Sequence, residues 1–155
     1  MRITLCAVGK LKEKHWQAAA AEYQKRLRRY AHIAVIEIKD SKSAGRSDAQ
    51  IREDESSRLL QRIPPFAFAI ALDKSGDRLS STGLAAFLHK KGLHRHSELA
   101  FCLGGPLGFS KEFLQQAGRI LSLSPLTFPH ELARVILLEQ LYRAFTITHG
   151  EKYHK

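Results

Sequence analysis

Phe66-Ala-Phe-Ala-Ile-Ala-Leu72 and Glu98-Leu-Ala-Phe-Cys-Leu103 are the two stretches that decide the fold class of this chain. Both are almost continuously apolar instead of alternating between apolar and polar residues, so each predicts a strand that is buried on both faces. Strands of that kind are typical of parallel sheets with helices on both sides. We therefore expect an α/β protein with a mostly parallel sheet.

The segments around these two strands fit the same plan. Further strands are predicted at Ile3–Val8, Ile33–Ile38 and Ile120–Leu123. Helices are predicted at residues 12–30, 47–62, 80–91, 110–118 and 130–144, and a capping box at Ser47-Asp-Ala-Gln50 opens the second of them. Asp73–Arg78 holds glycine and aspartate and is predicted as a turn. Strand and helix alternate with short connections and no linker, so we expect one three-layer α/β domain over residues 1–155.

Composition excludes several classes of protein. A hydrophobic content of 44% favours a globular chain over a disordered basic tail. No apolar run reaches the roughly 18 residues of a membrane helix, and residues 1–9 lack the order of a signal peptide. Cys6 and Cys102 lie far apart in apolar runs, which excludes a disulfide scaffold and a cysteine-based zinc motif, and the histidines show no metal-ligand spacing. We expect a cytoplasmic protein with no membrane segment and no metal.

The positive charge is unevenly placed. The chain has 25 Lys+Arg and 15 Asp+Glu, a net charge of +10. The first 50 residues hold 11 basic and 5 acidic side chains, a net charge of +6. Lys10–Lys14 and Lys25–Arg29 carry most of the excess, and His89–His96 forms a third basic patch. Such a surface suits a polyanion such as RNA, and a plain solvated helix face fits it equally well.

Ligands of parallel sheets bind at the carboxyl ends of the strands, which directs attention to the loops after Leu72, Leu103 and Leu123. Gly104-Gly-Pro-Leu-Gly108 is a glycine loop between a strand and a helix, although its spacing matches neither a dinucleotide fingerprint nor a phosphate loop. Leu123-Ser-Pro-Leu-Thr-Phe-Pro-His130 is stiffened by two prolines, and with Ser124 and Thr127 it could grip a flat heterocycle. Plain connecting turns remain the alternative for both segments.

The last predicted helix is apolar around most of its circumference, so part of it could pack on a second subunit. Polar residues such as Arg134 interrupt that surface and need a partner, a ligand or a phosphate. His130 and His154 could act as bases, while a structural or solvated histidine is the commoner case. The terminal Tyr153-His154 pair is useful only if the tail folds over a site.

These segments together resemble a known family. Ala7-Val-Gly-Lys10, the Gly104–Gly108 loop, the Leu123–His130 segment, Arg134, Glu139-Gln-Leu-Tyr-Arg-Ala144 and Tyr153-His154 are similar to the pseudouridine N3-methyltransferases of large-subunit ribosomal RNA, in the SPOUT superfamily. The resemblance covers the whole chain. It implies a SPOUT-type fold with a deep trefoil knot in the C-terminal third, a homodimer, and an RNA substrate in the assembled ribosome.

The resemblance also implies the site residues. It assigns S-adenosylmethionine as cofactor, contacted by Leu72, Gly104, Leu123, Ser124, Pro125, Leu126, Thr127 and Phe128. The methyl group would move by in-line attack from N3 of the uracil ring, whose proton must leave. His154 or Tyr153 would accept that proton, and Arg134 would contact a phosphate or a carbonyl oxygen.

Two other functions stay open at this point. A non-catalytic ribosome-associated RNA-binding protein explains the charge but not the glycine loop and the proline segment. An ordinary Rossmann-type methyltransferase usually has its glycine-rich loop after the first strand, where this chain has Gly9-Lys-Leu-Lys12.

Overall fold

The computed structural model describes residues 1–93 and 98–154. In chain order the elements are β1 (Arg2–Val8), α1 (Lys14–Leu27), β2 (His32–Ile38), α2 (Asp48–Leu60), β3 (Phe68–Arg78), α3 (Ser81–Gly92), β4 (Glu98–Leu103), α4 (Lys111–Gln116), β5 (Arg119–Ser122) and α5 (His130–Thr148). Residues 94–96 of the third predicted basic patch lie outside this description. Among the described helices, none combines the length and the apolar character needed to cross a membrane.

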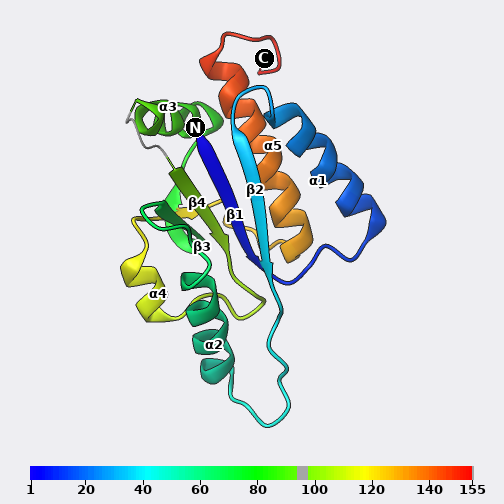
Figure 1. The fold of residues 1–155 in the computed structure, drawn as a ribbon, viewed down its shortest axis with the longest axis vertical. Helices are drawn as coiled ribbons and strands as arrows, with labels where there is room; N and C mark the ends of the chain where they lie inside the picture. Colours follow the sequence, from blue (N-terminus) through cyan, green and yellow to red (C-terminus); the bar gives the residue numbers. More distant parts are fainter. Residues whose placement is uncertain (94–97, 155) are drawn as a thin grey trace.

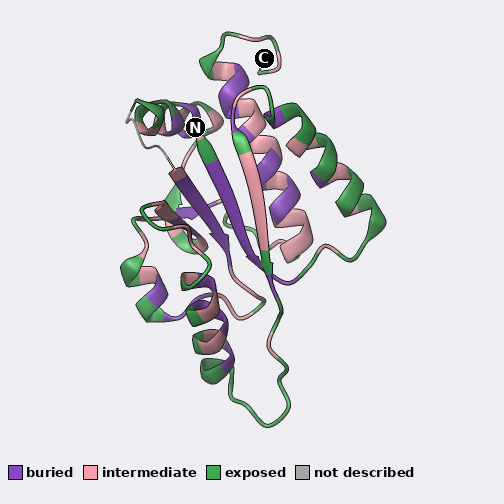
Figure 2. Ribbon diagram, in the orientation of Figure 1, coloured by how far each residue is buried: buried purple, intermediate pink, exposed green. Residues whose placement is uncertain are grey.

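The strands form one sheet in the order β2-β1-β4-β3-β5 (Figure 1). Every neighbouring pair of these strands is parallel. The two decisive apolar stretches lie in β3 and β4, which pair with each other inside the sheet, so the prediction of parallel strands is confirmed. Burial on both faces is confirmed for β4. It is wrong for part of the other stretch, because β3 begins at Phe68 and is fully buried only at Ile70 and Ala71, while Phe66 precedes the strand and is exposed with a φ of 69°. Figure 2 shows β1 and β4 buried along almost their whole length.

Helices cover both faces of the sheet. On one face, apolar side chains of α1, α3 and α5 share a core with the strands; its members include Leu27, Leu88, Leu138, Leu141, Ile3, Leu5 and Phe101. On the other face α2 and α4 pack through Leu59 and Phe113 against Cys6, Ala71 and Cys102. The three-layer α/β prediction is therefore confirmed.

Most of the apolar surface of α5 is buried inside the chain itself. Leu137, Leu138 and Leu141 are at most 1% exposed, because α5 lies between α1 and α3 on the sheet. Leu132 and Ile136 are half-buried. Packing within one chain therefore accounts for most of the apolar residues around the helix, and the homodimer stays a prediction.

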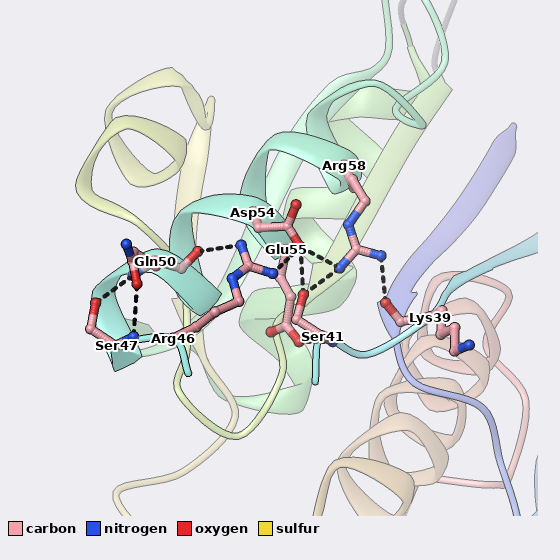
Figure 3. Close-up of polar contacts among 8 residues, drawn as sticks. All are labelled: Lys39, Ser41, Arg46, Ser47, Gln50, Asp54, Glu55 and Arg58. Carbon is pink, nitrogen blue, oxygen red and sulfur yellow. Dashed lines mark hydrogen bonds and ion pairs between the residues drawn. The ribbon is translucent and has the colours of Figure 1, made fainter. Parts of the chain in front are cut away.

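The loop between β2 and α2 is tied to α2 by a polar network (Figure 3). The predicted capping box is present: the Gln50 N–H donates to the Ser47 hydroxyl, and the Ser47 N–H donates to the Gln50 side-chain oxygen. The Ser41 hydroxyl donates to Asp54 at 2.5 Å, and Arg58 donates to Asp54 at 2.9 Å and to the carbonyl of Lys39 at 2.7 Å. The loop therefore has a defined position beside the helix.

The prediction of a turn at Asp73–Arg78 is wrong, because β3 continues to Arg78. Leu72 and Asp77 both pair with Leu121 of β5, so the residues between them make a detour around that position. A Cβ on Gly76 would stand 2.6 Å from the carbonyl carbon of Ile120. The glycine that suggested a turn instead permits close approach of the β5 backbone.

Candidate functional site

A cavity of about 670 Å³ lies at the carboxyl ends of β4 and β5 and beside the middle of β3, where the detour of that strand begins. Its volume is in the range of small-molecule sites. Three segments build it: Leu72–Lys74, Leu103–Gly108 and Ser122–Ala133, the last without Pro125, Glu131 and Leu132. The structure thus brings together all the residues predicted to hold the cofactor except Pro125, which does not line the cavity.

The glycine loop owes its shape to close backbone contacts. The Gly108 N–H donates to the Gly105 carbonyl at 2.9 Å, and Gly108 has a φ of 77°, which favours glycine. A Cβ on Gly104 would lie 3.2 Å from the backbone of Gly108. These contacts fold the loop back on itself at the wall of the cavity.

Side chains of helix α2 contact the glycine loop and the residues that follow it. The Ser110 N–H donates to the Ser56 hydroxyl at 2.8 Å in the interior. Glu55 is 3% exposed, and its Oε2 would lie 2.5 Å from a Cβ on Gly105. Glu55 Oε1 meanwhile accepts from the Ser41 N–H at 2.8 Å, so one buried carboxylate contacts both the β2–α2 loop and the glycine loop.

The proline segment after β5 is held by its own hydroxyl groups. Ser122 Oγ donates to the Ser124 carbonyl at 3.0 Å, and Ser124 Oγ accepts from the Leu126 N–H at 3.0 Å. The Ser124 hydroxyl therefore serves the turn itself. Leu126 is 71% exposed at the cavity, an apolar side chain available to a ligand.

The N-terminus of α5 closes the cavity against the end of β1. His130 lines the cavity, and its Nε2 would be 3.3 Å from a Cβ on Gly9, which has a φ of 84°. Arg134, one turn further along α5, is 1% exposed. It donates to the Gly9 carbonyl at 2.8 Å and forms an ion pair with Glu37. Arg134 therefore lies behind the cavity wall, where its guanidinium joins β1, β2 and α5.

The tail packs on α1 and α5. The Tyr153 hydroxyl donates to Glu139 at 3.1 Å, and the Tyr153 ring lies 4.8 Å from the Tyr142 ring with the Arg143 guanidinium over it. Burial and the nearby Glu139 carboxylate raise the pKa of Tyr153, so its phenol stays protonated at neutral pH. His154 is exposed.

The tail and the cavity lie at opposite ends of α5 (Figure 1). The helix runs from His130 at the cavity to Thr148, and 19 residues at 1.5 Å each span about 28 Å. Within one chain the structure therefore separates the predicted catalytic pair, Tyr153 and His154, from the predicted cofactor residues.

Asp73 and Lys74 line the cavity, although the sequence pattern places them in a turn and gives them no role in the site. A usable signal is present, because they directly follow Leu72 and so come after a continuous apolar stretch of the parallel sheet. The local sequence of residues 73–78 does not reveal that residues 77–78 pair with β5.

Comparison with known proteins shows the family of this chain and a structure with a similar fold. The family described as "Predicted SPOUT methyltransferase" matches residues 1–154, and the chain belongs to this family of methyltransferases. Among solved structures, the chain is similar to a probable methylase family protein from Haemophilus influenzae Rd KW20. That likeness has a TM-score of 0.53 at 12% identity and covers 97% of this chain and 67% of the other. At that identity it shows a shared fold.

Proposed function

We propose that this protein transfers a methyl group from S-adenosylmethionine to N3 of a pseudouridine in large-subunit ribosomal RNA, in the assembled ribosome. The observation that carries the proposal is the cavity, in which the three strand-end segments meet around Leu72, Gly104 and Leu123–Phe128. Membership of the SPOUT methyltransferase family supports the reaction class. The two buried free cysteines fit the cytoplasm, where thiols stay reduced.

The residues of the cavity fit the cofactor. Leu123, Leu126 and Phe128 provide apolar surface for the adenine ring, and the backbone groups of this stiff segment can read its edge. On the opposite side Gly108 has no side chain, and a Cβ there would project toward Asp73. When bound, S-adenosylmethionine supplies an electrophilic methyl group on a sulfonium. The chain's part is to hold it facing the base and to accept the N3 proton.

We also propose that the chain forms a homodimer in which one subunit's tail completes the other subunit's cavity. From Thr148 to His154 the extended backbone spans at most about 22 Å, which is short of the roughly 28 Å length of α5. Contacts of Tyr30 with Glu151 at 2.7 Å and of Tyr153 with Glu139 hold the tail at the far end of its own subunit. A second subunit is therefore the simplest source of the catalytic tail.

Within this arrangement His154 is the proton acceptor. Imidazole is the most common proton acceptor among side chains, whereas the raised pKa of Tyr153 makes that phenol a hydrogen-bond donor. Arg134 acts as a positioning residue in this proposal, because its guanidinium is buried against Gly9 and Glu37. It fixes the start of α5, and with it His130 and the cavity wall.

We further propose the deep trefoil knot of this superfamily for the C-terminal third. Knots are rare in proteins, so the proposal rests on the family membership.

Two measurements test the proposed function. Calorimetry with S-adenosylmethionine should show specific binding by the purified protein, and a non-catalytic RNA-binding protein would show none. Mass spectrometry of ribosomal RNA from a deletion strain should show the loss of one N3-methylated pseudouridine, restored by the intact gene. An unchanged set of modified nucleosides in the deletion strain would contradict the proposal.

A further inference from the structure

Asp73 is a charged residue of the cavity to which the predicted site assigns no role. It directly follows Leu72 in β3 and lines the cavity. The other ionisable side chains that line it, among residues 1–93 and 98–154, are Lys74 and His130. Asp73 is thus the single carboxylate in the described part of the cavity wall.

A local hydrogen-bonded turn within the detour of β3 fixes the orientation of this carboxylate. Asp73 Oδ1 accepts from the Ser75 N–H at 2.9 Å and from the Ser75 hydroxyl at 2.6 Å. This Asx-turn holds one oxygen and leaves Oδ2 without a hydrogen-bond donor among the described residues. Oδ2 lies 3.8 Å from the position of a Cβ on Gly108, and that glycine carries no side chain to cover it. The free oxygen therefore faces the cavity on the side of the glycine loop.

This placement selects one half of the cofactor. If the adenine ring lies on the Leu123–Phe128 segment, as proposed above, the wall left for the rest of the cofactor is the glycine loop with Asp73 Oδ2 beside Gly108. That half carries the sulfonium and the α-ammonium group, both positively charged. A preoriented carboxylate without a donor of its own attracts such a cation more strongly inside a cavity than in water.

We propose that Asp73 binds the cationic methionyl half of S-adenosylmethionine and gives the cavity its preference for this charged cofactor over uncharged adenosine derivatives. The proposal rests on the proposed function, since it concerns the same cavity. It adds a ligand contact and a basis for specificity that the resemblance does not supply.

Calorimetry on the full chain without RNA tests the assignment. One ligand is S-adenosylmethionine. The other is 5′-methylthioadenosine, which keeps the adenine, the ribose and a sulfur but lacks the amino-acid group and the positive charge. Asp73→Asn keeps an oxygen for the Ser75 N–H and removes the charge. We expect its Kd for S-adenosylmethionine to rise about tenfold or more, the scale of one hydrogen bond to a charged group, with little change for 5′-methylthioadenosine.

Asp77→Asn is the matched control. Asp77 belongs to the same strand, its side chain is 69% exposed, it pairs with Arg119 at 3.3 Å, and it does not line the cavity. The substitution changes net charge by the same amount and should leave both affinities at the wild-type value. Ser75→Ala, which removes only the 2.6 Å hydroxyl contact, should weaken binding by a smaller factor in the same direction as Asp73→Asn.

The outcomes separate this inference from the proposed function. Equal weakening of both ligands by Asp73→Asn would place the carboxylate on the ribose, and unchanged affinities would remove it from the site; either result overturns the inference alone. If the wild-type protein bound neither ligand, the proposed function would fail as well. An unchanged thermal midpoint of Asp73→Asn shows that a loss of affinity is not a loss of folding.

Discussion

Gly76 lies where two segments of backbone make direct contact. A Cβ at this position would stand 2.6 Å from the backbone of Ile120 and Leu121, and backbone cannot move aside as a flexible side chain can. We expect Gly76→Ala to lower the free energy of unfolding by about 1–3 kcal/mol, the usual cost of overpacking. Urea denaturation followed by circular dichroism measures it.

Gly45→Ala is the comparison for that experiment. Gly45 has a φ of 73° but nothing within 4 Å of its would-be Cβ, so its substitution carries only the backbone strain of about 1 kcal/mol. Equal stability of Gly76→Ala and wild type would mean that β5 does not pass against this glycine in solution.

Residue contacts between distant parts of the chain are the least predictable feature. The sequence identifies Arg134 as a polar residue that needs a partner, and it has one in Glu37, 97 residues away. The hydrophobic pattern of α5 contains no information about β2. That Arg134 needs a partner could therefore be expected, while its pairing with Glu37 and the Gly9 carbonyl behind the cavity wall could not.

Elements governed by local chemistry follow their sequence signals closely. Ser47, Ser80 and Ser110 each accept a backbone N–H at the start of a helix, as their sequence positions indicate. Asp73–Arg78 shows the limit of such reasoning. Its turn-forming residues give a local preference that pairing with β5 overrides, and β5 is a non-local partner.

The junction between α2 and the β2–α2 loop depends on an ionised carboxylate. The Ser41 hydroxyl, with Arg58 and Arg46 nearby, holds the pKa of Asp54 below its ordinary value. A lowered folded-state pKa stabilises the fold above the ordinary value of about 4, and this contribution is lost as the pH falls through the folded-state pKa. We expect Asp54→Asn to lower the free energy of unfolding at pH 7 by less than about 1 kcal/mol, because the carboxylate is partly exposed.

Urea unfolding of wild type and Asp54→Asn at pH 7, 4 and 2.5 measures this effect. The difference between the two proteins should shrink as the pH falls. Glu53→Gln, an exposed position on the same helix, removes a charge without this network and should show no such pH-dependent difference. If the difference in free energy of unfolding between wild type and Asp54→Asn stayed constant with pH, the charge of Asp54 would not contribute to stability.

At the scale of the whole molecule, α5 separates the cavity from the tail by about 28 Å. The predicted last helix ends at residue 144, four residues before α5 does, so the sequence leaves open a tail that folds back over its own cavity. Which chain's cavity the tail serves is a property of the assembly. Two variants that are inactive alone give a direct test. Gly104→Val blocks the cavity, and His154→Ala removes the tail histidine.

When the two variants are co-expressed in equal amounts, random assembly makes about half of the dimers mixed. Each mixed dimer has one intact site out of two, so we expect about a quarter of wild-type methyl transfer. If cavity and tail of the same chain worked together, no mixed dimer would contain an intact site and activity would stay absent. Calorimetry first checks that His154→Ala still binds S-adenosylmethionine and that Gly104→Val does not.

The basic cluster Lys25–Arg29 at the C-terminal end of α1 is the surface that we propose for RNA, and its charges are unequally available. Arg26 pairs with Glu22 at 2.7 Å and Arg29 with Glu151 at 3.4 Å, whereas Lys25 and Arg28 are exposed and make no ion pair with the described residues. Lys25 and Arg28 are therefore the side chains of this surface that a phosphate can reach without competition from a carboxylate.

Removing one side chain that binds a phosphate should reduce the slope of log affinity against log salt by about 0.7–0.9, so Lys25→Ser/Arg28→Ser should reduce it by about 1.5 in filter binding to large-subunit RNA. Arg62→Ser/Lys111→Ser removes the same charge from exposed positions on the α2 and α4 face and should leave the slope unchanged. Cofactor affinity should be unaltered in both. Equal slopes for the two double variants would mean that α1 does not face the RNA, since counterion release counts only the phosphates that the protein neutralises.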